Sequence, residues 1–174
     1  MNKILMALIV ACTFIFSGCD KELPTADKME SSAYSIGTSA ALVANLTTIT
    51  DENRANVIDL VTEIQKYTPV NGEGLATAWT KIVDTYIETN VTSEKMSAEQ
   101  ANVVRTTINV LINSADYIIN KKWPSLVEYE DLLAAASRGI CEGFLTNFKP
   151  ANVLSAASPE YDKDAYDYLM NSSK

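Results

Sequence analysis

The sequence predicts an all-α protein, built as a helical bundle or orthogonal array of five helices plus a short C-terminal helix. Three observations support this prediction. Apolar residues recur at intervals of three and four positions through most of the chain. Short connections with proline, glycine or helix-capping residues separate the periodic segments. No segment shows the sustained alternation of apolar and polar residues that is typical of a half-buried strand.

The first two predicted helices each follow a threonine. Thr25 can cap the first, whose apolar face comprises Met29, Ala33, Ile36, Ala40 and Val43. The second begins after Thr50-Asp51-Glu52, and its apolar face comprises Val57, Leu60, Val61 and Ile64. We expect it to end before Pro69, because the residue that precedes a proline is disfavoured in the α region. The glycine-containing segment 70–74 then connects it to the next helix.

The fourth predicted helix has the clearest start in the chain. The third helix comes before it, with an apolar face of Leu75, Ala78, Trp79, Ile82, Val83 and Tyr86. Ser97 and Gln100 then form a capping box, in which each side chain accepts a hydrogen bond from the backbone N–H of the other residue. The apolar stripe that follows comprises Ala101, Val104, Ile108, Leu111, Ala115 and Ile118. This stripe is long and wide, so we expect the helix to be central and Leu111 to lie in the core.

Two capping signals mark the remaining helices. After the break at Trp123-Pro124, Ser125 and Glu128 are expected to form a second capping box that opens the fifth helix. Pro150 sets the latest end of that helix. Ser158-Pro159-Glu160 is expected to open a short last helix that runs through Leu169, with Tyr161, Tyr168 and Leu169 docking it onto the bundle.

Small residues recur at helical spacing on two of the predicted helices. Gly139 and Gly143 lie four apart on the fifth helix, and Ala33, Gly37 and Ala41 follow the same spacing on the first. Such stripes allow two helices to approach closely. The surrounding helices contain many polar residues, so we expect this close packing inside a bundle and not within a membrane.

The beginning of the chain has the features of a signal peptide. Lys3 is followed by an apolar run over residues 4–16, and Ser17-Gly18 then lead to Cys19 and the charged segment 20–22. A membrane-spanning helix needs about 20 apolar residues, so this run is too short to be a good anchor by itself.

The segment Phe16-Ser17-Gly18-Cys19 resembles the lipobox of bacterial lipoproteins. The resemblance covers about the first 20 residues and implies that Cys19 is diacylated and becomes the mature N-terminus. It divides the chain into a signal peptide (1–18), the lipidated cysteine with a short tether (19–24) and a single helical domain (25–174). The tether 20–24 spans at most roughly 17 Å, which would keep the domain close to the bilayer of the cell envelope.

The membrane that would hold this anchor is left open by the sequence. Asp20 follows Cys19 directly, and in enterobacterial lipoproteins an aspartate there resembles an inner-membrane retention signal. In other bacteria, acidic residues after the cysteine can accompany surface display.

Composition excludes several classes of function. The formal net charge is −8, and an acidic surface repels nucleic-acid phosphates. The chain has no histidine, which removes the usual general base and the commonest zinc ligand.

Cys141 is expected to be a buried free thiol. The acidic group of Glu160, Asp162, Asp164 and Asp167 lacks the pattern of a calcium loop, so we expect it to form a solvated helical face.

These observations favour a non-enzymatic helical module that binds a membrane-proximal protein partner and needs no cofactor or metal. A more specific alternative is an exclusion or immunity lipoprotein encoded by a phage or mobile element, which blocks an envelope receptor or channel. A second alternative is a small enzyme that uses carboxylates or Cys141.

Overall fold

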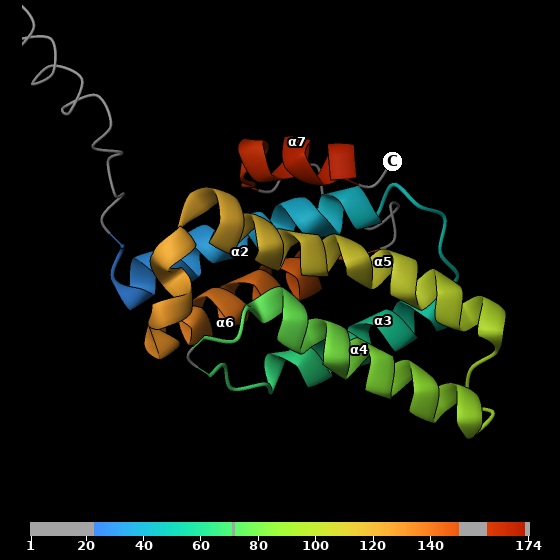
Figure 1. Cartoon of the computed structure of the whole chain (residues 1–174). Coiled ribbons are helices and arrows are strands. Elements are labelled where there is room, and N and C mark those ends of the chain that lie inside the picture. The colour runs from blue at the N-terminus through green and yellow to red at the C-terminus, as the bar shows by residue number, and fades with distance from the viewer. Residues whose placement is uncertain (1–22, 71, 150–159, 173–174) are drawn as a thin grey trace, which may run out of the picture.

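A computed structural model describes residues 23–70, 72–149 and 160–172, and every regular element in these ranges is helical (Figure 1). The α-helices are α2 (Ala26–Ala44), α3 (Asp51–Gln65), α4 (Leu75–Thr92), α5 (Ala98–Tyr117), α6 (Glu130–Asn147) and α7 (Lys163–Ser172). A π-helical turn, η1 (Ile118–Lys122), and a 3-10 helix, η2 (Pro124–Glu128), join α5 to α6. The predicted all-α fold, with five helices and a short C-terminal helix, is confirmed.

Local sequence explains where α5 and α3 begin. The backbone N–H of Gln100 donates to Ser97 Oγ at 3.2 Å, and the backbone N–H of Ser97 donates to Gln100 Oε1 at 2.7 Å. The predicted capping box is therefore confirmed. Thr50 caps α3 by accepting a hydrogen bond from the backbone N–H of Asn53 at 3.2 Å. Thr25 occupies the N-cap position of α2, but its side chain makes no capping hydrogen bond.

Helices α2 and α6 form a parallel pair with unusually close backbones. Residue numbers rise together along the contact, because Gly139 lies against Glu30 and Gly143 lies against Tyr34. A Cβ added to Gly143 would overlap the Tyr34 carbonyl oxygen and lie 2.9 Å from the backbone nitrogen of Thr38. One added to Gly37 would overlap the Ile140 carbonyl oxygen. The close packing predicted from the small-residue stripes is thus confirmed.

Helix α5 is central, as its wide apolar stripe predicts. It packs against each of the other described α-helices, α2, α3, α4, α6 and α7. Leu111, in the second half of α5, has no exposed surface. Val57 of α3 is also fully buried, and Ile82 of α4 is half-buried against the same core.

The prediction that Ser125 and Glu128 open the fifth helix is wrong. These residues belong to η2, and α6 begins at Glu130. Tyr129 separates the two elements with an extended backbone, at φ −128° and ψ 96°. Leu126 is fully buried, so the segment turns tightly to place that side chain in the core.

The predicted start of the last helix is also wrong. Ser158 and Pro159, its expected first residues, lie outside the described residues. Glu160 precedes the helix, which begins at Lys163. Asp162 takes the capping role, since its Oδ1 accepts a hydrogen bond from the backbone N–H of Ala165 at 2.9 Å.

Candidate functional site

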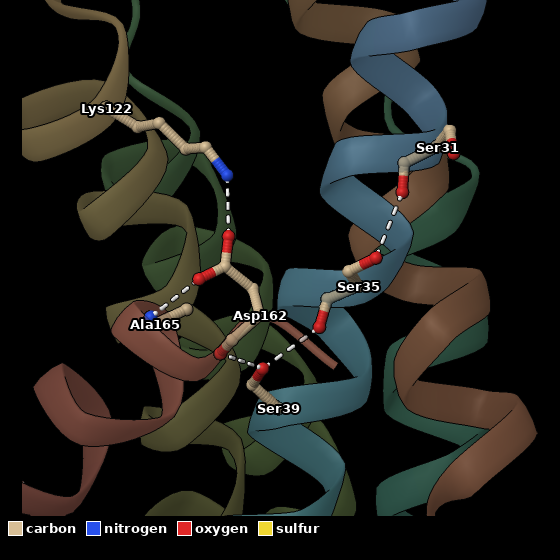
Figure 2. Close-up of polar contacts among 6 residues, drawn as sticks. All are labelled: Ser31, Ser35, Ser39, Lys122, Asp162 and Ala165. Carbon is tan, nitrogen blue, oxygen red and sulfur yellow. Dashed lines mark hydrogen bonds and ion pairs between the residues drawn. The ribbon is translucent and has the colours of Figure 1, made fainter. Parts of the chain in front are cut away.

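Asp162 is the centre of a polar junction that joins three helical elements (Figure 2). Lys122 Nζ donates to Asp162 Oδ2 at 2.5 Å, and the side chains are only 24% and 15% exposed. The Ser39 hydroxyl donates to the Asp162 carbonyl oxygen at 2.8 Å. The backbone N–H of Asp162 donates to the Ser35 carbonyl oxygen at 3.2 Å. One residue therefore joins α7 to both α2 and η1.

The expectation that Asp162 lies on a solvated helical face is wrong. Burial opposes ionisation of this carboxyl group, but hydrogen bonds from Lys122 and from the backbone N–H groups of Ala165 and Asp164 outweigh it, so the pKa of Asp162 lies below its usual value. Sequence periodicity could not reveal this, because Lys122 lies 40 residues away on a different element.

The buried face of α7 adds apolar contacts to the polar junction at Asp162. Leu169 and Ala165 are fully buried. The ring of Tyr168 lies 5.2 Å from that of Tyr117 on α5, measured between centroids. Docking through Leu169 and Tyr168 is therefore confirmed. Tyr161 is 41% exposed, and its ring makes an edge-to-face contact with that of Tyr166 on α7 itself. Its predicted role in docking the helix onto the bundle is therefore wrong.

Cys141 has the surroundings of an inert thiol. It lies on α6 with no exposed surface, as predicted. Burial, reinforced by the nearby charge of Glu142, raises the pKa of Cys141 to about 12. The nucleophile of cysteine chemistry is the thiolate, so this side chain is poorly suited to covalent catalysis near neutral pH.

A polar network closes the C-terminal ends of the parallel pair α2 and α6. The Asn45 side-chain amide donates to the Asn147 carbonyl oxygen at 2.9 Å, and Arg54 Nη1 donates to Asn45 Oδ1 at 3.3 Å. The Arg54 guanidinium also lies 4.6 Å from the centroid of the Phe148 ring. Both helix dipoles place negative partial charge at this end, which favours a cation there. Helical periodicity could not reveal this network, because parallel pairing brings the two ends together.

Among the described residues, the surface has grooves that could accept a ligand or partner, and three are considered. The α3–α4 groove, of about 500 Å³, is lined by Glu63, Lys81, Ile82, Thr85, Tyr86, Thr89 and Asn90. An acidic groove of about 550 Å³ is lined mainly by Asp27, Glu30, Ser31, Tyr34, Glu142 and Glu160. A third groove, of about 670 Å³, lies between α2, α5 and α7 and includes Val43, Leu46, Thr106, Val110 and Met170.

The described residues contain no group of three or more cysteine, aspartate and glutamate side chains placed to hold a metal ion. Within the same ranges, no helix combines the length and apolar character needed to cross a bilayer. Cys19, the predicted lipid-anchor residue, lies outside the described ranges, as does the whole signal-peptide segment 1–18.

Comparison with known proteins gives no relative: no family model, no curated protein and no solved structure matches this chain.

Proposed function

We propose that this protein is a lipid-anchored protein of the bacterial cell envelope, whose helical domain binds a membrane-proximal protein partner without catalysing a reaction. The observation that carries the proposal is the cysteine motif Phe16-Ser17-Gly18-Cys19 at the end of an apolar run, followed within a few residues by a helical domain. Two acyl chains give stable anchoring, since each buried CH₂ contributes about 0.8 kcal/mol.

The α3–α4 groove is the proposed partner surface. Helix α4 packs against α5 and α3 and presents its other side to solvent. Half-buried Ile82 and Tyr86 give the groove an apolar floor, while Glu63 and Lys81 supply charges at its edge. A small apolar centre with a polar rim is the usual composition of a protein interface. The buried, high-pKa Cys141 supports the non-enzymatic part of the proposal.

Fatty-acid labelling in the producing cell tests the anchor. Cys19→Ser should abolish incorporation of labelled fatty acid and release the protein from membranes or stall its processing. Cys12→Ser provides a matched control, because it removes a cysteine seven residues earlier within the same segment. Incorporation that persists in the Cys19→Ser protein would refute the lipobox assignment.

Photo-crosslinking in the native membrane tests the partner surface. A photoreactive residue at exposed Thr85, in the α3–α4 groove, should give one defined crosslinked protein. The same residue at exposed Thr106, in the groove between α2, α5 and α7, should give none. Crosslinking from Thr106 alone, or equally from both positions, would contradict the assignment to the α3–α4 groove.

A further inference from the structure

We propose that one end of the bundle, here termed the anchor-end surface, rests against the phospholipid headgroup layer. The surface comprises Lys28, Lys66, Val70, Lys121 and Tyr129. The proposal rests on the lipid anchor at Cys19 and adds to it the orientation of the domain on the membrane.

The parallel pairing of α2 and α6 determines which residues share this end. Glu30 of α2 pairs with Arg138 of α6, with their charged atoms 2.8 Å apart. Helix α2 begins four residues before Glu30, at Ala26, whereas α6 begins eight residues before Arg138, at Glu130. At 1.5 Å per residue, α6 therefore projects about 6 Å beyond the start of α2. Tyr129, just before α6, lies at the projecting tip.

The connection between α3 and α4 lies at the same end. The backbone N–H of Gly72 donates to the carbonyl oxygen of Val127 at 3.1 Å, which brings this connection beside η2 and Tyr129. Val70 and Lys66 belong to this connection, and Lys121 lies in η1, the element before η2. In Figure 1 the blue start of α2 and the gold and orange segments that lead into α6 lie at the same end of the bundle.

The chain between Cys19 and the bundle is too short to hold this end far from the bilayer. Leu23 is partly buried against the core, so the domain begins there. Three residues lie between Leu23 and Cys19, so the four Cα–Cα steps from one to the other span at most about 14 Å. The headgroup region of one leaflet is roughly 5–8 Å thick, and the tip of α6 projects into the same space.

The exposed side chains at this end suit an interface with lipid. Val70 is 50% exposed and Tyr129 is 48% exposed, and tyrosine is enriched at membrane–water interfaces. The three lysines of the anchor-end surface are exposed and can meet phosphate groups. Exposed carboxylates occur at the same end, since Asp27 directly precedes Lys28 and Glu128 directly precedes Tyr129. This mixture of charges matches zwitterionic headgroups, which carry both signs, better than a purely anionic surface.

The orientation also explains why the partner should be membrane-proximal. Helix α4 begins at the anchor end with Leu75, and the α3–α4 groove runs from Lys81 to Asn90 along it. At 1.5 Å per residue these residues lie about 9–22 Å beyond the start of α4. A protein bound in this groove would therefore lie close to the bilayer.

Depth-dependent fluorescence quenching tests the proposal on the mature acylated protein. The protein is purified from the producing cell and placed in phosphatidylcholine vesicles that contain a lipid with a nitroxide on its headgroup. Tyr129→Cys and, as a matched control, Leu46→Cys are each labelled with an environment-sensitive dye. Leu46 is 64% exposed and follows the opposite end of α2, which is about 28 Å long. Buried Cys141 will compete little for the dye.

The expected result is at least a twofold loss of dye fluorescence at Tyr129→Cys and little change at Leu46→Cys. Equal quenching at both positions, or stronger quenching at Leu46→Cys, would overturn the orientation. Mass spectrometry of the same samples measures acylation separately. Acylated protein without quenching at Tyr129→Cys refutes the anchor-end surface alone, whereas protein that lacks the acyl chains refutes the lipid anchor and the surface with it.

Discussion

Substitution of Gly143 by alanine tests the close approach of α2 and α6. The added methyl group would overlap the carbonyl oxygen of Tyr34 and lie 2.9 Å from the backbone nitrogen of Thr38. Both neighbours are backbone atoms of α2, so the two helices must separate locally. Overpacking of this kind typically costs about 1–3 kcal/mol, and the contact with rigid backbone places the cost of Gly143→Ala at about 3 kcal/mol. A domain of this size has about 5–15 kcal/mol of stability in total.

The direction of the stability change distinguishes a close contact at Gly143 from an open helix face. Alanine favours helix by about 0.5–1 kcal/mol over glycine, so Gly143→Ala would stabilise a helix whose face at this position were open. The assay is urea unfolding of the chain from Asp20 onward, followed by far-UV circular dichroism. Gly74→Ala is the control, because a Cβ there meets nothing within 4 Å. Unchanged or increased stability of Gly143→Ala would refute the close parallel pairing.

Three further predictions concern the core, the α7 junction and the free thiol. Leu111→Ala should lower the free energy of unfolding by about 2–5 kcal/mol in the same urea assay, since this fully buried side chain would leave a cavity; wild-type behaviour would contradict its place in the core. Asp162→Asn should lower the free energy of unfolding at pH 7 by about 1 kcal/mol, because it removes the ion pair with Lys122. Asp167→Asn removes an exposed ion pair with Lys163 and should lower it by less than about 0.5 kcal/mol. The pKa of Asp162 is lower in the folded protein than in the unfolded chain, where it is about 3.9. The ionised carboxylate therefore stabilises the fold above that unfolded value, and the stabilisation is lost as pH falls through the folded pKa. Urea melts of Asp162→Asn and wild type should converge below about pH 4, and a constant difference in stability would contradict this. Cys141 should resist iodoacetamide at pH 7.5 in the folded protein and react after unfolding in urea, as followed by mass spectrometry; rapid labelling of the folded protein would contradict its burial.

The sequence by itself determined the helices and their inward faces. Each helix depends on hydrogen bonds between residues four apart and on caps within a few residues, so its signals lie together in the chain. The Ser97 capping box, the central position of α5 and the burial of Leu111 could all be predicted for this reason. The signal failed at Ser125, where burial of Leu126 favours a 3-10 turn over the expected α-helix.

Only the tertiary structure decided which helices meet and in what direction. The small-residue stripe that contains Gly37 predicts a close contact, but no local pattern specifies that α2 and α6 run parallel, with their ends level to within about one turn. Asp162 likewise resembles a surface carboxylate in the sequence and becomes a junction because Lys122, 40 residues earlier, folds against it. The physical reason is the same in both cases: pairings between distant segments depend on how the whole core packs, whereas helix formation depends on neighbours along the chain.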